Sequence, residues 1–165
     1  MSEMDSEALE FGLYHREILN SALRESTAPL ARLGLNPALM NVLNAIAGCP
    51  GASGALIAET NDTSQQAAAR SLAHLISRGL VRRTVGERAT FSHHLTPEGE
   101  AKLFAGLTIV ARQNRDLLSV LSERELDEYL RLTRKLHSVR ARRSVEEVAR
   151  LTWAADTDSE SGGRE

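Results

Sequence analysis

Apolar residues recur three or four positions apart over most of this chain, which is the spacing of amphipathic helices. Residues 6–28 carry the first such pattern, and we predict a helix there that ends near Pro29, since the residue before a proline avoids helical geometry. Asn36 and Pro37 predict the start of a second helix, because asparagine suits the N-cap and proline suits the first turn. The apolar side of this second helix consists of Leu39, Val42, Leu43 and Ile46.

Two shorter helices are predicted next, the first capped by Ser53, with a break between them at Asn61 and Asp62. Thr63 is predicted to cap the second of them, because Gln66 stands three positions later, as in a capping box. Gly79 is predicted to end it, since glycine tolerates the left-handed conformation found just past many helices. Two helices joined by so tight a break have the spacing of a helix-turn-helix.

Alternating β-prone residues replace the helical pattern after Gly79. Residues 81–85 and 89–93 are predicted to form the two strands of a small hairpin, with residues 86–88 as its turn. The hairpin therefore follows the helix-turn-helix directly.

Helical spacing returns in the rest of the chain. Thr96 and Pro97 predict the start of a long helix, and a capping box at residues 122–125 predicts another. A third capping box opens a short segment at residues 144–153. The middle of the chain is too small for the long helices at both ends to bury their apolar sides fully against it. We therefore predict that two copies of the chain pack together as a homodimer.

The second helix of the helix-turn-helix has an outer side that suits DNA. With Leu72 taken as the core direction, the inner residues are Ala68, Ala69, Leu75 and Ile76. Glutamine can pair with an adenine edge, arginine with a guanine edge, and alanine can touch a thymine methyl. The helix start attracts phosphate. The candidate DNA-contacting residues of this helix are Thr63, Ser64, Gln65, Gln66, Ala67, Arg70 and His74. The alternative is an ordinary amphipathic helix with a solvated polar side.

Basic residues are concentrated in and just after this helix. The formal net charge of the whole chain is −2, so DNA binding requires the positive charge to gather on one surface. From Arg70 to Arg88 the charged residues are arginines apart from a single glutamate. Arg82, Arg83 and Arg88 are candidate phosphate contacts, and Arg88 at the hairpin tip is a candidate for the minor groove. A basic edge that only prevents strand aggregation is the alternative. Together with the helix-turn-helix, the pattern favours DNA binding.

The run LISRGLVRR at residues 75–83, followed by HLTPEGEAKL at residues 94–103, carries a family resemblance. It is similar to the end of the recognition helix, the wing and the next helix of the multiple-antibiotic-resistance regulator (MarR) family, and the element order agrees over about residues 8–140. The resemblance implies a mainly α fold: a winged helix-turn-helix with a small β-hairpin wing, and a helical dimerisation region formed by the N- and C-terminal helices. It also implies a dimeric repressor that binds a pseudo-palindromic operator in double-stranded DNA and is released by a small molecule.

Two features depart from the family pattern. The hairpin tip lacks the aspartate that commonly holds the wing arginine, so Arg88 takes that position without its partner, and the residues after Arg140 extend past the usual end. The predicted organisation is an N-terminal dimerisation helix (6–35), a DNA-binding lobe (36–96), C-terminal dimerisation helices (97–153) and a disordered acidic tail (154–165).

The resemblance also implies an effector crevice between the dimer helices and the lobe. The residues predicted to line it are Tyr14, His15, Met40, Leu43 and Leu107, for which core packing is the alternative. Cys49 has no cationic neighbour in the sequence to stabilise a thiolate, so we interpret it as a structural thiol rather than a redox sensor. Neighbouring residues of a strand point to opposite faces, so His93 and His94 are unsuited to sharing one ion. No metal and no cofactor are predicted.

Composition narrows the class further. The 165 residues are 42% hydrophobic and 25% charged, as in ordinary soluble domains. The sequence contains no P-loop, GxGxxG, GxSxG or HExxH pattern, so we do not expect an enzyme. An acidic start, a single cysteine and the lack of any run of about 18 apolar residues predict a cytoplasmic protein without a membrane partner. The remaining alternative is a helical adaptor that binds another protein and not DNA.

Overall fold

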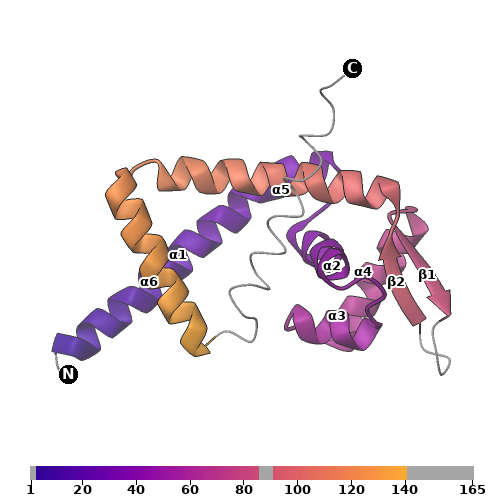
Figure 1. Ribbon diagram of the computed structural model, residues 1–165, viewed down its shortest axis with the longest axis horizontal. Coiled ribbons are helices and arrows are strands. Elements are labelled where there is room, and N and C mark those ends of the chain that lie inside the picture. The colour runs from indigo at the N-terminus through magenta and orange to yellow at the C-terminus, as the bar shows by residue number, and fades with distance from the viewer. Residues whose placement is uncertain (1–2, 86–90, 141–165) are drawn as a thin grey trace, which may run out of the picture.

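The computed structural model describes residues 3–85 and 91–140, and these form a mainly helical chain with one β-hairpin (Figure 1). The elements in order are α1 (Glu3–Arg32), α2 (Pro37–Gly48), α3 (Gly54–Thr60), α4 (Gln65–Ser77), β1 (Val81–Val85), β2 (Phe91–Leu95), α5 (Pro97–Leu118) and α6 (Glu123–Arg140). A lobe made of α2, α3, α4 and the hairpin lies at one end of α5, and α6 begins at the other end, in the half of the picture that also holds the start of α1 (Figure 1). The predicted mainly α fold class is confirmed.

The core of the lobe is built from the apolar sides of its helices. Leu43 of α2, Ile57 of α3 and Leu75 of α4 are completely buried. Leu30 from the end of α1 and Leu103 from α5 belong to the same buried cluster. The lobe is therefore packed against both of the long helices that lead away from it.

Most of the predicted helix starts are confirmed by their cap hydrogen bonds. The side chain of Asn36 accepts a bond from a first-turn N–H of α2 at 2.9 Å, and that of Thr96 accepts one from α5 at 3.0 Å. Ser53 caps α3 in the same way. At the start of α6, the hydroxyl and the backbone N–H of Ser122 both donate to Glu125. The hydroxyl bond is the main reason that the pKa of Glu125 lies below its usual value.

The predicted end of the first helix near Pro29 is wrong, because α1 continues through this proline to Arg32. Leu30 is buried in the core, and the backbone N–H groups of Leu33 and Leu35 both donate to its carbonyl oxygen at 2.9 Å. Burial of Leu30 and these two bonds hold the last turn in place. They outweigh the single bond that a proline cannot donate.

The N-cap of α4 is Ser64 rather than Thr63, so the predicted capping box is wrong by one residue. The hydroxyl of Ser64 accepts a hydrogen bond from the backbone N–H of Ala67 at 3.1 Å. The backbone N–H of Thr63 donates to the carbonyl of Ala58, which closes the turn after α3 and leaves the next residue to cap α4. Gln66 then occupies the second helical position instead of the third, where a capping box requires it.

Replacing each of the two adjacent hydroxyl residues by alanine tests this assignment. Ser64→Ala removes the acceptor of a helix N–H, and we expect it to lower the free energy of unfolding by about 1 kcal/mol. Thr63→Ala leaves that hydrogen bond in place and should cost clearly less. Urea unfolding of the two variants measures the difference, and equal losses would contradict Ser64 as the cap.

Gly79 ends α4 as predicted, with a positive φ of 71°. The backbone N–H of Gly79 donates to Ile76, and that of Leu80 donates to Leu75, which is the Schellman arrangement. The turn carries Leu80 into the core, where it is completely buried. β1 therefore begins directly beside the end of α4.

The hairpin is confirmed, but its second strand, Phe91–Leu95, lies two residues later than the predicted 89–93. His93 explains the displacement, because it is buried and forms a bridge with Ala52 at the outer side of β2. These contacts set the register, in which Val81 faces Leu95 across the strands. The predicted turn at 86–88, with Arg88, lies outside the described residues.

The predicted segment 144–153 and the predicted tail 154–165 also lie outside the described residues. Within the described ranges, no helix is both long and apolar enough to span a lipid bilayer.

Candidate nucleic-acid interface

The outward side of α4 carries the polar residues predicted to read DNA. Gln66, Arg70 and His74 are exposed and follow one another in steps of four, so they lie along one line on the helix surface. We call these three residues the recognition stripe. The buried residues of α4 are Ala68, Leu72 and Leu75. The helix therefore separates a core side from a polar side, as the sequence predicts.

Two alanines of α4 are placed differently from the prediction. Ala69, predicted to face the core, is exposed, and Ala67, predicted to face outward, is half-buried. The helical wheel takes Leu72 as the centre of the buried side, whereas the buried residues Ala68, Leu72 and Leu75 centre close to Ala68. This rotation of the helix against the core turns Ala69 toward solvent and Ala67 toward the protein.

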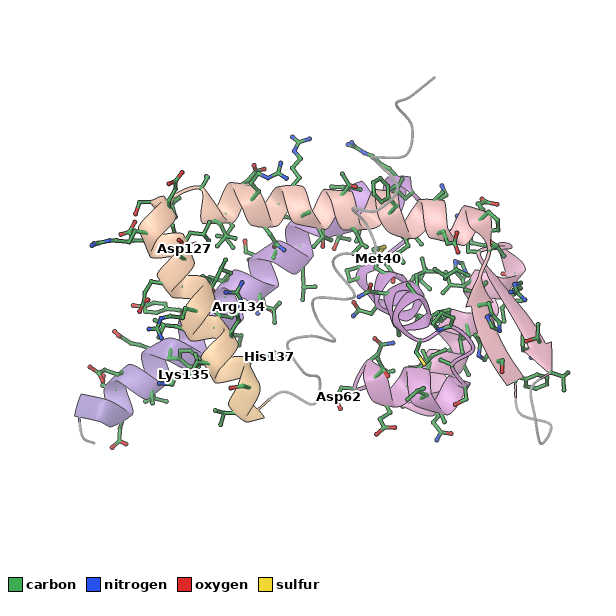
Figure 2. All side chains as sticks on the ribbon, viewed as in Figure 1. Met40, Asp62, Asp127, Arg134, Lys135 and His137 are labelled. Atoms are coloured by element: carbon green, nitrogen blue, oxygen red, sulfur yellow. The ribbon has the colours of Figure 1, made fainter. Side chains whose placement is uncertain are left out.

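The N-terminal end of α4 opens toward solvent. Thr63, Ser64 and Gln65 are exposed there. The preceding Asp62 has a positive φ of 48° and lies at the end of α3 (Figure 2). The positive end of the helix dipole and the first N–H groups of a helix attract anions, so this end can receive a phosphate.

The C-terminal end of α4 is held by hydrogen bonds to two neighbouring segments. The guanidinium of Arg78 donates to the carbonyl of Gly34 in the turn between α1 and α2. The hydroxyl of Thr96 donates to the carbonyl of Gly79 at 2.7 Å. Arg78, one of the arginines in the basic run of the sequence, is thus engaged within the protein. No sequence signal could reveal this contact, because it joins residues 44 positions apart.

Arg82 and Arg83 are both exposed on β1 and point to opposite faces of the hairpin. Arg82 faces His94 across the strands. The guanidinium carbon of Arg83 lies 4.1 Å from the centre of the Phe91 ring. The sequence analysis did not single out Phe91, because its position over Arg83 depends on the strand register.

Histidine and cysteine side chains are dispersed over the lobe. The Nδ1 atom of buried His93 lies 2.9 Å from the carbonyl oxygen of Ala52, while His94 is half-buried near Gly51. Cys49 is exposed at the C-terminal end of α2. In residues 3–85 and 91–140, no three His, Cys, Asp or Glu side chains are grouped closely enough to hold a metal ion.

The residues predicted to line an effector crevice fall into two separate groups. Leu43 and Met40 are buried in the core, and Leu107 packs against it; Figure 2 shows Met40 between α2 and α5. Tyr14 and His15 are exposed on the first half of α1. They stand about 24 Å along the helix from the end that packs on the lobe, at 1.5 Å per residue. Within one chain they do not form a single pocket with the other three.

The terminal helices expose large apolar side chains. On α1 they follow two opposite sides of the helix. One side carries Leu9, Leu13, Leu19 and Leu23, and the other carries Phe11, Tyr14 and Ile18. On α6 the exposed apolar residues are Tyr129, Leu132, Leu136 and Val139. Exposed apolar surface of this extent is typical of interaction surfaces.

Comparison with known proteins points to one family. Residues 33–89, from the end of α1 into the hairpin, match the model described as the MarR family. No curated protein sequence matches the chain. Rv2887, a MarR-family protein of Mycobacterium tuberculosis solved with p-aminosalicylic acid, superposes with a TM-score of 0.66 at 25% identity, over 76% of this chain and 96% of that one.

Two further solved structures share the fold at lower identity. BldR, a transcriptional regulator of Sulfolobus solfataricus, has a TM-score of 0.70 at 22% identity, over 85% of this chain and all of its own. MepR, which regulates the Staphylococcus aureus multidrug efflux pump MepA, has a TM-score of 0.67 at 20% identity, over 79% of this chain and 98% of its own. The lobe and both long terminal helices thus have counterparts in solved transcription regulators.

Proposed function

From the premise that the chain belongs to the MarR family of transcription regulators, we propose that it binds double-stranded DNA as a homodimer. It represses its target genes until a small molecule releases it, and it is not an enzyme. Residues 36–96 form the DNA-binding lobe, and residues 6–35 and 97–153 form the dimer. The operator is a pseudo-palindrome, because the two lobes are related by two-fold symmetry.

The observation that carries this proposal is the recognition stripe on a helix whose end is held in place. Gln66, Arg70 and His74 are exposed, while the opposite side of α4 is buried and its C-terminal end is bonded to two neighbouring segments. A fixed helix can present paired hydrogen-bonding groups to base edges in the major groove. The proposed contacts are Thr63, Ser64, Gln65, Gln66, Arg70, His74, Arg83 and Arg88. Ala67 is left out because it is half-buried, and Arg82 is left out because it lies on the face of the hairpin opposite to buried Val81 and His93.

The exposed apolar sides of α1 and α6 support the homodimer. A second copy would bury both sides of α1, which a single chain leaves open to water. The two recognition helices should then stand about 34–36 Å apart, which is one turn of DNA.

An effector site in this chain requires the second protomer. Rv2887 was solved with p-aminosalicylic acid, and we propose an organic ligand of comparable size here. Tyr14 and His15 lie too far from Met40, Leu43 and Leu107 to share a pocket with them in one chain. Only a neighbouring lobe can bring the two groups together.

Selection of bound sequences from a random pool of duplex DNA tests the proposed function. A dimeric regulator should enrich an inverted repeat, and binding should weaken steeply as salt is raised. No binding to any duplex at low salt would overturn the proposal and favour the helical adaptor.

Arg70→Ala tests base reading by the recognition stripe. We expect the variant to lose about 1–3 kcal/mol of binding free energy on the selected operator and to discriminate less between sequences. Arg112→Ala, which removes an exposed arginine of α5 away from α4, is the matched control. Equal losses by Arg70→Ala on the operator and on random duplex, measured by fluorescence anisotropy, would contradict base reading by Arg70.

A further inference from the structure

The two adjacent arginines of β1 have different surroundings because successive strand residues point to opposite faces. Arg83 shares its face with Val81 and His93, which are both buried against the helices of the lobe. Arg82 shares the opposite face with Thr84, and both are exposed. Arg83 therefore lies on the side of the hairpin that faces α4, two residues along β1 from buried Val81.

The guanidinium of Arg83 is held by an aromatic ring. Phe91 faces Val85 across the strands, which places it diagonally opposite Arg83, and the guanidinium carbon lies 4.1 Å from the ring centre. Phe91 is 46% exposed, so it does not belong to the core, and Arg83 packs on its ring at the protein surface. Stacking fixes the plane of the guanidinium and leaves its edge N–H groups free to donate.

We propose that Arg83 is the arginine through which the described part of the hairpin contacts the DNA backbone, and that Phe91 is the residue that positions it. The inference rests on the proposed DNA-binding function and separates Arg83 from Arg82, which the sequence treats alike. A guanidinium already ordered over a ring loses less freedom when it binds a phosphate oxygen than a free arginine does. Within the described part of the hairpin, no aromatic ring lies over Arg82, which points away from α4.

A purely structural role for the pair is the competing explanation. Cross-strand contacts between side chains stabilise hairpins, so the Phe91–Arg83 contact could serve the hairpin alone. The two explanations differ in what salt does to DNA binding. Only a phosphate contact changes the number of counterions that are released when the complex forms.

The first measurement compares Arg83→Ala with its neighbour Arg82→Ala on a random-sequence duplex long enough for both half-sites. Loss of one phosphate contact per protomer should make the slope of log K against log salt shallower by about 1.8 for the dimer. Arg82→Ala should leave the slope unchanged. A slope that changes equally in both variants, or in neither, overturns the inference.

The second measurement tests Phe91 as the positioning residue. Phe91→Leu keeps an apolar side chain next to Val85 but removes the aromatic face, and we expect it to weaken binding by about two- to fivefold. Phe91→Tyr keeps the ring and should bind like the wild type. Phe91→Leu added to Arg83→Ala should cause no further loss, because the ring then has no guanidinium to hold. Equal losses from the leucine and tyrosine variants, or an additive double variant, would overturn the positioning role.

Two controls keep the outcomes distinct. Leu56→Ala removes an exposed apolar side chain from α3, outside the proposed dimer region and the proposed DNA contacts, and should leave DNA binding unchanged. Melting curves of all variants report any loss of folding. If the wild type binds no duplex at low salt, the proposed function itself fails; if the wild type binds and the two arginines behave alike, only the present inference fails.

Discussion

Leu19→Glu should split the homodimer and reduce operator affinity by about 100-fold or more. Leu19 is 60% exposed on one apolar side of α1, where a second copy would bury it. Two glutamates buried without partners in a symmetric interface carry a large desolvation cost, since each protomer contributes one. A monomer then binds a single half-site and loses the gain in effective concentration that the linked second lobe provides. Sedimentation equilibrium and fluorescence anisotropy measure the two effects.

Leu56→Glu is the matched control for that experiment. Leu56 is also an exposed leucine, but it lies on α3 in the lobe, far from the exposed half of α1 (Figure 1). The same change at this position should leave sedimentation as a dimer unaltered. Glutamate is a good helix former, so intrinsic propensity predicts no loss of α1 in the Leu19 variant. A Leu19→Glu protein that remains a dimer at micromolar concentration would contradict the proposed interface.

Local chemistry made much of this fold predictable from the sequence. Asn36, Ser53 and Thr96 cap helices as predicted, because a short polar side chain before a helix satisfies an N–H group that has no partner in the helix. Gly79 ends α4 for an equally local reason, its positive φ. Such features need only a few neighbouring residues, so a single sequence reveals them.

The errors arose where distant contacts decide between local alternatives. Thr63 and Ser64 are both suitable caps, and the choice falls to the bond between Thr63 and Ala58 of the preceding helix. Pro29 stays within α1 because the next residue is buried in the lobe. The exposed position of Ala69 depends on how α4 is rotated against the core. None of these contacts is encoded in the spacing of residues along one element.

The same limit applies to the candidate DNA interface. Helical spacing alone predicted the recognition stripe, because the side of a helix follows from its period. It could not distinguish among the arginines that follow. Arg78 is bonded to Gly34, and Arg83 is stacked on Phe91. Those partners come from another turn and another strand, so the sequence could not show that Arg78 is engaged within the protein or that Arg83 is held in one orientation.

Gly99→Ala, at the start of α5, should strongly destabilise the protein. A Cβ atom at Gly99 would overlap the carbonyl oxygen of Leu80. That carbonyl cannot retreat easily, because Leu80 is completely buried and its oxygen accepts the backbone N–H of Thr96 at 3.1 Å. Overpacking against fixed backbone should lower the free energy of unfolding by about 3 kcal/mol or more. The close approach of α5 to the end of α4 thus explains why a glycine stands in the HLTPEGEAKL run.

Two other glycines provide a graded comparison for that variant. A Cβ at Gly106 would overlap the Sδ atom of Met40, which is the far end of a flexible side chain and can move, so Gly106→Ala should cost less than Gly99→Ala. A Cβ at Gly54 would lie 3.7 Å from Leu72, an ordinary contact, so Gly54→Ala should be nearly neutral. Urea unfolding of the three variants measures the order. If Gly99→Ala is no less stable than Gly54→Ala, α5 does not pack closely on the backbone of Leu80. The proposed support of the C-terminal end of α4 by α5 would then be wrong.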